Sequence, residues 1–237
     1  MSDNIKFLRV IMKRSQINSI IRQSIDFFEK HNFILPPFAY FNLKDWRNLK
    51  EDASEIFDIP LGWDITDFGK GNFDNIGLIL FTLRNGKLGS DKYTKPYTEK
   101  IMIQKKDQIT PMHFHKSKME DIINRGGGVL AIQLYMADEN GQFSADDLSL
   151  SMDGIKKTFK AGEWVYIKPG QSITLTQAVY HTFHAENSDV LVGEVSMVND
   201  DHHDNFFYDE VGRFPEILED VEPAYLLVND YSKFLKP

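Results

Sequence analysis

A series of short, strand-length apolar segments fills the middle of the chain and constrains its fold more than any other feature. Turn signals such as Asn85-Gly86 and Asp153-Gly154 separate several of these segments. Many short strands joined by tight turns are typical of a β-sandwich or a barrel. The expected strands are 76–83, 100–104, 109–115, 129–135, 148–152, 155–159, 163–167, 172–176, 179–185 and 190–195. The sequence therefore predicts a mainly β fold.

The segments on either side of this region have a different texture. Apolar residues recur at helical spacing in 15–31 and again after Asn42, whereas 62–75 is rich in Gly, Asp and Asn and is typical of a loop. We therefore expect one domain over residues 1–237. Its parts are a helical N-terminal extension packed outside (1–75), a β-barrel (76–199) and a C-terminal tail over the barrel (200–237).

Composition excludes several classes of function. The chain has no cysteine, so it has no disulfide framework, thiolate metal site or cysteine nucleophile. Its net charge of −8, from 27 basic and 35 acidic residues, disfavours binding to a nucleic-acid backbone. No apolar run approaches the ~20 residues of a membrane span, and residues 1–14 lack a signal-peptide pattern. We expect a cytoplasmic protein with no nucleic-acid or membrane partner.

The segment 111–128 carries the residues with the clearest chemistry. His113 and His115 are two residues apart on an expected strand, so their imidazoles share one face. Glu120 follows after a turn or bulge and offers a carboxylate oxygen to the same point. Three glycines at 126–128 then allow the backbone to reverse into the next strand. Two histidines on a strand are often ordinary polar residues, but His-x-His-x4-Glu-x6-Gly in a strand-rich chain favours a metal site.

A fourth ligand is expected from a strand across the barrel, after the Pro169-Gly170 turn. His181 and His184 both lie on such a segment. They are three residues apart, so on a regular strand they point to opposite faces, and only one of them can face the metal. The spacing leaves open which one it is. Three imidazoles and a carboxylate accept Mn²⁺, Co²⁺, Fe²⁺, Ni²⁺ or Zn²⁺.

This pattern resembles the first motif of the cupin superfamily, Gly-x5-His-x-His-x3-4-Glu-x6-Gly, although Asp107 stands at its first glycine. The second cupin motif is matched loosely, with different spacings. The matching residues are His113, His115, Glu120 and Gly127 in the first motif, and Gly162, Pro169, Gly170 and His181 in the second. The resemblance implies a cupin fold, which is a double-stranded β-helix or jelly-roll barrel.

Within the cupins, the chain is similar to bacterial D-lyxose isomerases. The similarity rests on Met-His-Phe-His at 112–115, on Lys-Met-Glu-Asp-Ile-Ile-Asn-Arg-Gly-Gly-Gly at 118–128 and on Asp-Glu-Val-Gly-Arg-Phe-Pro at 209–215. It implies an enzyme that interconverts D-lyxose and D-xylulose, and D-mannose and D-fructose, through an enediol. It also implies a divalent ion, most commonly Mn²⁺, and a homodimer. The metal ligands carried over are His113, His115, Glu120 and His181.

Isomerisation also needs groups that move protons and bind the sugar. Lys118 lies between expected ligands, where a bound cation would depress its pKa, and Glu210 belongs to the tail; we take these two as the catalytic acid/base candidates. Arg213 and Lys100 are the candidates for binding sugar hydroxyls, with Lys100 on a strand expected beside the metal-bearing one. Each of the four is also compatible with an ordinary solvated position.

Two other functions are compatible with the same ligand set. A cupin oxygenase would use iron and dioxygen, and a non-catalytic cupin would bind a sugar without turnover. The chain has no Gly-x-Gly-x-x-Gly opening a helix and no Gly-Lys-Ser/Thr motif, so we expect no nicotinamide, flavin or ATP requirement. The expected partner is a small monosaccharide.

Overall fold

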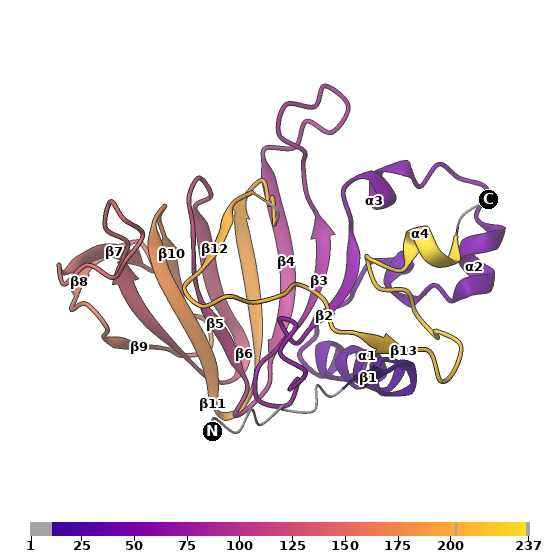
Figure 1. Ribbon diagram of the computed structural model, residues 1–237, viewed down its shortest axis with the longest axis horizontal. Helices are drawn as coiled ribbons and strands as arrows, with labels where there is room; N and C mark the ends of the chain where they lie inside the picture. Colours follow the sequence, from indigo (N-terminus) through magenta and orange to yellow (C-terminus); the bar gives the residue numbers. More distant parts are fainter. Residues whose placement is uncertain (1–10, 202, 236–237) are drawn as a thin grey trace, which may run out of the picture.

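The computed structural model describes residues 11–201 and 203–235. Figure 1 shows a β-barrel at one end of the molecule and the helices gathered at the other. The strands are β1 (Met12–Lys13), β2 (Gly62–Thr66), β3 (Leu78–Arg84), β4 (Tyr97–Gln104), β5 (Ile109–His115), β6 (Glu120–Met136), β7 (Leu148–Met152), β8 (Ile155–Phe159), β9 (Trp164–Ile167), β10 (Ser172–Leu175), β11 (Val179–Met197), β12 (Asn205–Phe207) and β13 (Ile217–Leu218). The helices are α1 (Arg14–Lys30), the 3₁₀ helix η1 (Pro37–Tyr40), α2 (Leu43–Asn48), α3 (Ser54–Asp58) and α4 (Tyr231–Phe234). The predicted mainly β fold with helices outside is confirmed.

Two long antiparallel strands, β6 and β11, belong to both walls of the barrel. The second half of β11 pairs with β4 and with the first half of β6, and this wall continues through β10, β7 and β8. The first half of β11 pairs with β5 and with the second half of β6, which also pairs with β9. Segments 179–185 and 190–195, predicted as separate strands, are thus halves of one strand.

The three glycines bend β6 rather than reversing it, so that part of the prediction is wrong. The strand runs through them from Glu120 to Met136, and its register with β11 shifts between Glu186 and Val190. Gly127 has φ +92°, and a Cβ there would lie 2.1 Å from the carbonyl oxygen of Asp189. The chains therefore approach so closely at this bend that only glycine fits.

Helix α1 covers the outer face of the wall formed by β2, β3 and β4. Successive side chains of β3 alternate between two cores: Leu78 and Leu80 face the barrel interior, whereas Ile79 and Phe81 pack beneath α1. The helix buries Ile17, Ile21 and Phe28 against this face. Because β3 is buried on both faces, it appears in the sequence as a continuous apolar run.

Other predicted boundaries differ in informative ways. Strands 109–115, 148–152 and 155–159 are confirmed as β5, β7 and β8. Residues 62–66 form strand β2 rather than the start of a loop, so the N-terminal segment is not purely helical. Every residue of β2 is buried and the strand pairs with β3. Trp63, Ile65 and Thr66 are strand-forming residue types, so the loop composition describes only the residues after Thr66.

The C-terminal tail first reaches the barrel and then returns to the helical side, as the path from β12 to β13 shows (Figure 1). β12 pairs with β5, so that Phe207 lies opposite His113. Further on, β13 pairs with β1 and α4 follows. Among the described residues, no helix is both long and apolar enough to cross a membrane.

Candidate metal centre and active site

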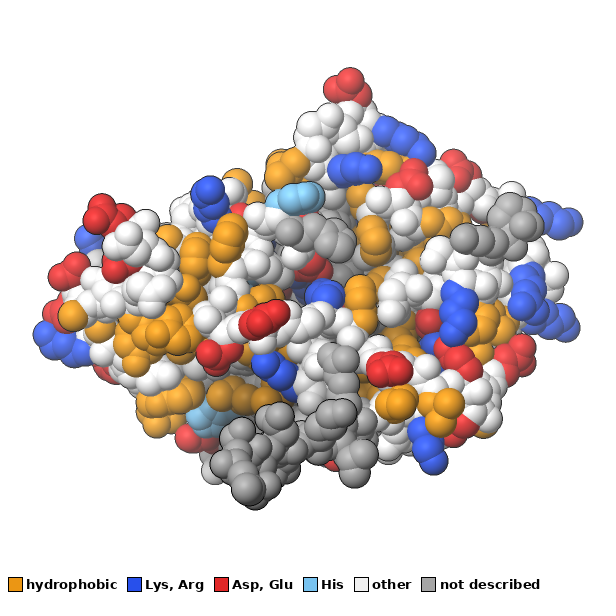
Figure 2. Space-filling model, viewed as in Figure 1, with side chains coloured by type: hydrophobic (Ala, Val, Ile, Leu, Met, Phe, Trp, Pro, Cys, Tyr) orange, Lys and Arg blue, Asp and Glu red, His pale blue; other side chains and the backbone are white. Residues whose placement is uncertain are grey.

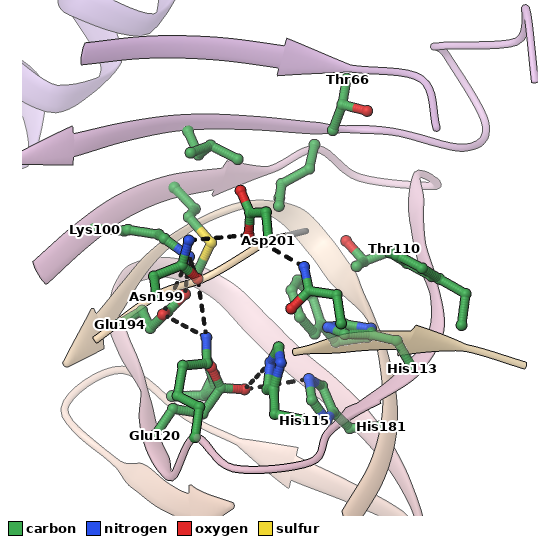
Figure 3. Close-up of a pocket in the computed structure, with 18 of the residues that line it drawn as sticks. Thr66, Lys100, Thr110, His113, His115, Glu120, His181, Glu194, Asn199 and Asp201 are labelled. Carbon is green, nitrogen blue, oxygen red and sulfur yellow. Dashed lines mark hydrogen bonds and ion pairs between the residues drawn. The ribbon is translucent and has the colours of Figure 1, made fainter. Parts of the chain in front are cut away.

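Three histidines from two adjacent strands converge inside the barrel (Figure 3). His113 and His115 come from β5, and His181 of β11 lies opposite His113 in the strand register. All three side chains are buried, and one ring nitrogen of each lies within 4.8 Å of the others. The two-residue periodicity of a strand thus brings the imidazoles together as predicted.

His181, and not His184, faces this cluster. The ring of His184 stacks edge-on against Trp164 at 4.8 Å, and its Nε2 lies 3.7 Å from Glu186. Its side chain is 30% exposed, whereas that of His181 is 1% exposed. The structure therefore places His181, and not His184, beside the other two histidines.

Glu120 completes the cluster from the first residue of β6. Its Oε1 lies 3.2 Å from Nε2 of His181 and 3.4 Å from Nε2 of His115. Burial alone would raise the pKa of Glu120, but the charge of Lys118 and a hydrogen bond with His115 hold it well below its usual value. Glu120 is therefore a buried, ionised carboxylate that points at the imidazoles.

Hydrogen bonds fix the orientation of two of the rings. Nδ1 of His113 lies 2.8 Å from the carbonyl oxygen of Pro111, and Nδ1 of His181 lies 3.1 Å from that of Val179. A carbonyl only accepts, so Nδ1 carries the proton and Nε2 keeps its lone pair. Burial lowers the pKa of both histidines, that of His181 to about 4, so both rings are neutral at pH 7.

Lys118 lies in the same cavity, buried between two carboxylates. Its Nζ is 2.8 Å from Oε2 of Glu120 and 3.0 Å from Oε1 of Glu194. Burial works to lower the pKa of Lys118, but the charges of Glu120 and Glu194 outweigh burial and raise it. In this arrangement Lys118 is a charged ammonium that bridges the two carboxylates.

Glu194 lies in this site although it was not among the residues predicted from the sequence. It lies on β11, is 4% exposed, and accepts hydrogen bonds from Lys118 and, at 2.9 Å, from Oγ of Ser196. Burial would raise its pKa, but Lys100 and Lys118 hold it below its usual value. Glu194 interrupts the otherwise apolar segment 190–195. Charged residues are rarely buried without a partner, so a lone carboxylate in such a segment indicates a functional position.

Lys100 lies at the cavity. Its strand, β4, pairs with β3 and with β11, the strand that carries His181, whereas it does not pair with β5, which carries His113 and His115. The side chain reaches the cavity, where Nζ lies 2.7 Å from Oδ1 of Asn199 and 3.3 Å from Glu194. Lys100 therefore contacts Glu194 from the neighbouring strand, β4.

Of the two predicted tail residues, Arg213 reaches the cavity and Glu210 does not. Arg213 donates to Asp201 at 3.0 Å and also to the buried Asp64. Glu210 is exposed and lies outside the residues that line the cavity; its backbone oxygen accepts a hydrogen bond from Lys70. The tail thus leaves the Glu210 carboxylate exposed and outside the cavity.

A barrel whose interior holds a His-x-His-x4-Glu motif and a distal histidine on the neighbouring strand defines the cupin class. The chain matches the D-lyxose isomerase family over residues 12–231. It is 50% identical to a D-lyxose/D-mannose isomerase of Escherichia coli O157:H7 and 47% identical to one of Serratia proteamaculans. Each match covers 94% of this chain and all of the relative. The chain belongs to the D-lyxose isomerase family, and it is an aldose–ketose isomerase.

Solved structures share the fold at low sequence identity. L-ribose isomerase of Acinetobacter sp. DL28, in a mutant form with L-ribose, superposes with a TM-score of 0.61 at 13% identity, covering 89% of this chain and 99% of that one. L-ribose isomerase of Geodermatophilus obscurus gives a TM-score of 0.60 at 15% identity, covering 89% and 100%. These similarities support the predicted cupin fold.

Proposed function

We propose that this enzyme interconverts D-lyxose and D-xylulose, and D-mannose and D-fructose, using one divalent ion. The observation that carries the proposal is the buried cluster of three imidazoles and a carboxylate in a chain about half identical to two D-lyxose/D-mannose isomerases. Family membership favours this activity over an iron oxygenase and over a non-catalytic sugar-binding cupin.

The residues present fit a divalent ion. His113, His115 and His181 offer neutral nitrogens, Glu120 offers an anionic oxygen, and backbone carbonyls orient two of the rings. Such a set suits Mn²⁺, our first choice, and also Co²⁺, Fe²⁺, Ni²⁺ or Zn²⁺. When bound, the ion would act as a Lewis acid toward adjacent sugar oxygens.

Isomerisation moves one proton between carbons and another between oxygens. We assign the transfer of the carbon-bound proton to Glu194. This carboxylate is ionised and buried, and it lines the same cavity as the candidate ligands. The carboxylate takes the proton from C2 of the aldose and returns it to C1 of the enediol. The Lys118 ammonium gives a proton to O1 and regains one from the hydroxyl at O2, which balances the reaction.

Lys100 and Arg213 are proposed to bind the substrate. Both line the same cavity as Glu194 and the histidines, and both carry donors that suit sugar hydroxyls. Glu210 stays a candidate base only if the tail rearranges, since its side chain is exposed. A direct comparison of Glu194 and Glu210 variants decides between the two carboxylates.

The experiment that tests the function is turnover of free sugars by the purified chain. Metal-stripped protein given Mn²⁺ and D-lyxose should form D-xylulose without any nicotinamide, flavin or ATP. Chelator-treated protein is the control, and it should regain activity when Mn²⁺ is returned. Failure to form ketose from D-lyxose or D-mannose with any of the five divalent ions would overturn the proposal.

We also propose an oligomeric state, from the resemblance to D-lyxose isomerases, and a location, from the composition. The first is a homodimer, which sedimentation equilibrium of the purified chain would reveal as twice the mass of 27.4 kDa. The second is a cytoplasmic location, which fits the absence of cysteine from the sequence. Cell fractionation tests the second.

A further inference from the structure

The cavity that holds the candidate ligands is too small for a whole sugar. Its volume is about 70 Å³, whereas pockets for small molecules occupy roughly 300–1,000 Å³. In the proposed reaction C1 and C2 lie at the histidine end, beside His113, His115 and His181. The remaining carbons must therefore extend away from the histidines and beyond this cavity.

A larger groove begins where the cavity ends. Its volume is about 720 Å³, and it has five lining residues in common with the cavity: Asn199, Asp201, Asn205, Phe207 and Arg213. We call these five residues the neck. Figure 2 shows a hollow near the middle of the molecule, between the barrel and the helical part, in which acidic and basic side chains are visible. The neck is thus the passage between the inner cavity and the outer groove.

The neck carries hydrogen-bonding groups in the arrangement that sugar hydroxyls need. Arg213 donates to Asp201 at 3.0 Å, and Asp201 also accepts from Asn199 at 3.0 Å and from Asn205 at 3.1 Å. The Arg213 and Asp201 side chains are 29% and 28% exposed, so a ligand can reach both. A hydroxyl both donates and accepts, and it can insert between such a cation and anion.

A second acceptor stands behind this pair. Asp64 is buried beneath Arg213 and lines the groove, and its Oδ1 has no hydrogen-bond partner among the described residues. A buried acceptor without a donor is costly. This oxygen is closed to the groove, so Asp64 contributes by holding Arg213 in place rather than by contacting the sugar.

We propose that the distal end of the sugar passes through the neck, where Arg213 and Asp201 bind its hydroxyls, and that the outer groove receives what extends beyond the fifth carbon. This inference rests on the proposed function and specifies its substrate class. The substrates are free, uncharged aldoses with five or six carbons, and a neutral substituent at the far end is accepted. Arg213 and Asp201 are thus specificity-determining residues.

The charges around the groove argue against phosphorylated sugars. Asp58, Asp64, Asp200 and Asp201 line it, against the cations Lys87 and Arg213 and the imidazole of His203. Arg213 already faces two carboxylates, so it has little positive charge to offer a phosphate. A dianionic phosphate at the sixth carbon would lie next to carboxylates, and like charges repel strongly where water is limited.

Substrate comparison with the wild-type, Mn²⁺-loaded enzyme is the first test. We expect kcat/KM for D-mannose and 6-O-methyl-D-mannose to lie within about tenfold of each other, and that for D-mannose 6-phosphate to be at least ~100-fold lower. A 6-O-methyl sugar more than ~100-fold poorer than D-mannose would show that the far end is closed and would overturn the inference. Equal use of the phosphate would overturn the charge argument.

Variants at the neck give a second, independent readout. Asp201→Glu keeps the charge but adds a methylene to the passage, so the ratio of kcat/KM for D-mannose to that for D-lyxose should fall at least ~5-fold. Asp26→Glu, at an exposed position of α1, is the matched control and should keep the wild-type ratio. If Asp201→Glu lowers kcat/KM equally for D-mannose and D-lyxose, Asp201 has a merely structural role and the assignment is overturned.

Asp201→Asn separates charge from shape. Removing the negative charge at constant size should raise the relative use of D-mannose 6-phosphate over D-mannose at least ~5-fold. No change in this ratio contradicts the role of Asp201 in substrate selection. Turnover of D-lyxose by the wild type tests the proposed function alone, so an active enzyme with unchanged ratios rejects only the neck, whereas an inactive wild type rejects both.

Discussion

Lys118 and Glu120, two residues apart at the entry to β6, form an ion pair of 2.8 Å in which each side chain is only 2% exposed. The two carboxylate oxygens of Glu120 have different partners. Oε2 accepts from Lys118, and Oε1 points at His115 and His181. Lys118 therefore orients the carboxylate that we propose as a metal ligand, in addition to its proposed role in proton transfer.

The first prediction follows from this double role of Lys118. Lys118→Met should lower kcat by a factor of ~10² or more and weaken metal binding by about 10–100-fold, because an orienting partner of a ligand is lost. Lys116→Met, at an exposed neighbouring position, should change neither quantity. Titration with Mn²⁺ and steady-state kinetics measure both. Unchanged turnover in Lys118→Met would remove this residue from the mechanism.

The second prediction concerns the histidines. His113→Ala should abolish both metal content and turnover, because one of four ligands is lost from a buried site. His184→Ala should retain both, since its ring lies on the outer face against Trp164. Elemental analysis of the two purified variants provides the comparison. A His113→Ala protein with full metal occupancy and full turnover would show that the ligand assignment is wrong.

The third prediction compares the two candidate carboxylates. Glu194→Gln keeps the shape but removes the base, so kcat should fall by a factor of ~10² or more with the metal retained. Glu210→Gln should stay within about threefold of the wild type, because its side chain is exposed and outside the cavity. The reverse result would move the base to the tail.

Solvent exchange gives a separate view of the same step. A carboxylate that carries the carbon-bound proton through an enediol can exchange it with water, so turnover in D₂O should place deuterium at C1 or C2 of the product. NMR of the product detects it. Substrate deuterium kept in full, with none gained from the solvent, would favour a hydride shift between the two carbons.

The ligand positions could be read from the sequence because a strand has a fixed two-residue period. His113 and His115 share a face for that reason alone, and Glu120 follows within one turn. The choice between His181 and His184 needed the register of β11 against β5, which depends on long-range pairing. Local sequence carries no information on that register.

Other parts of the site could not be predicted because distant segments create them. Glu194 looks like an interruption of an apolar strand until β4 brings Lys100 and the β5–β6 turn brings Lys118 beside it. Strand β2 is short and runs directly into the Gly-, Asp- and Asn-rich residues 67–75, which hide its Trp63, Ile65 and Thr66 in the sequence; its pairing with β3 reveals it. The motif at 209–215 made Glu210 a candidate catalytic residue, but its side chain is exposed in the structure.

The fourth prediction tests the bend in β6. Gly127→Ala should destabilise the fold by more than about 2 kcal/mol, because a Cβ would overlap the carbonyl oxygen of Asp189 in addition to the cost of a positive φ. Gly89→Ala is the control: its φ is +71° and nothing lies within 4 Å of the added Cβ. It should cost only about 1–2 kcal/mol. If denaturant unfolding shows the same loss of unfolding free energy for both variants, the close approach at Gly127 does not contribute to stability.

The fifth prediction concerns the link between α1 and the C-terminal segment. Arg14 is fully buried and pairs with Asp230 at 2.7 Å and with Glu219 at 2.8 Å. Arg14→Met should cost about 3–5 kcal/mol at pH 7, because Asp230 is left as a buried charge without its partner. Urea unfolding measures this loss, and Arg47→Met, at an exposed position of α2, is the matched control.

The same pair predicts how that loss depends on pH. The hydrogen bond from Arg14 lowers the pKa of Glu219 from 4.5 to about 2, so the folded state favours the ionised carboxylate. A carboxyl group with a depressed pKa in the folded state stabilises the fold above its unfolded pKa, and this contribution disappears as the pH falls toward 2. The free-energy difference between wild type and Arg14→Met should therefore be smaller at pH 3 than at pH 7. A difference that is constant across this range would show that Glu219 contributes nothing through its charge.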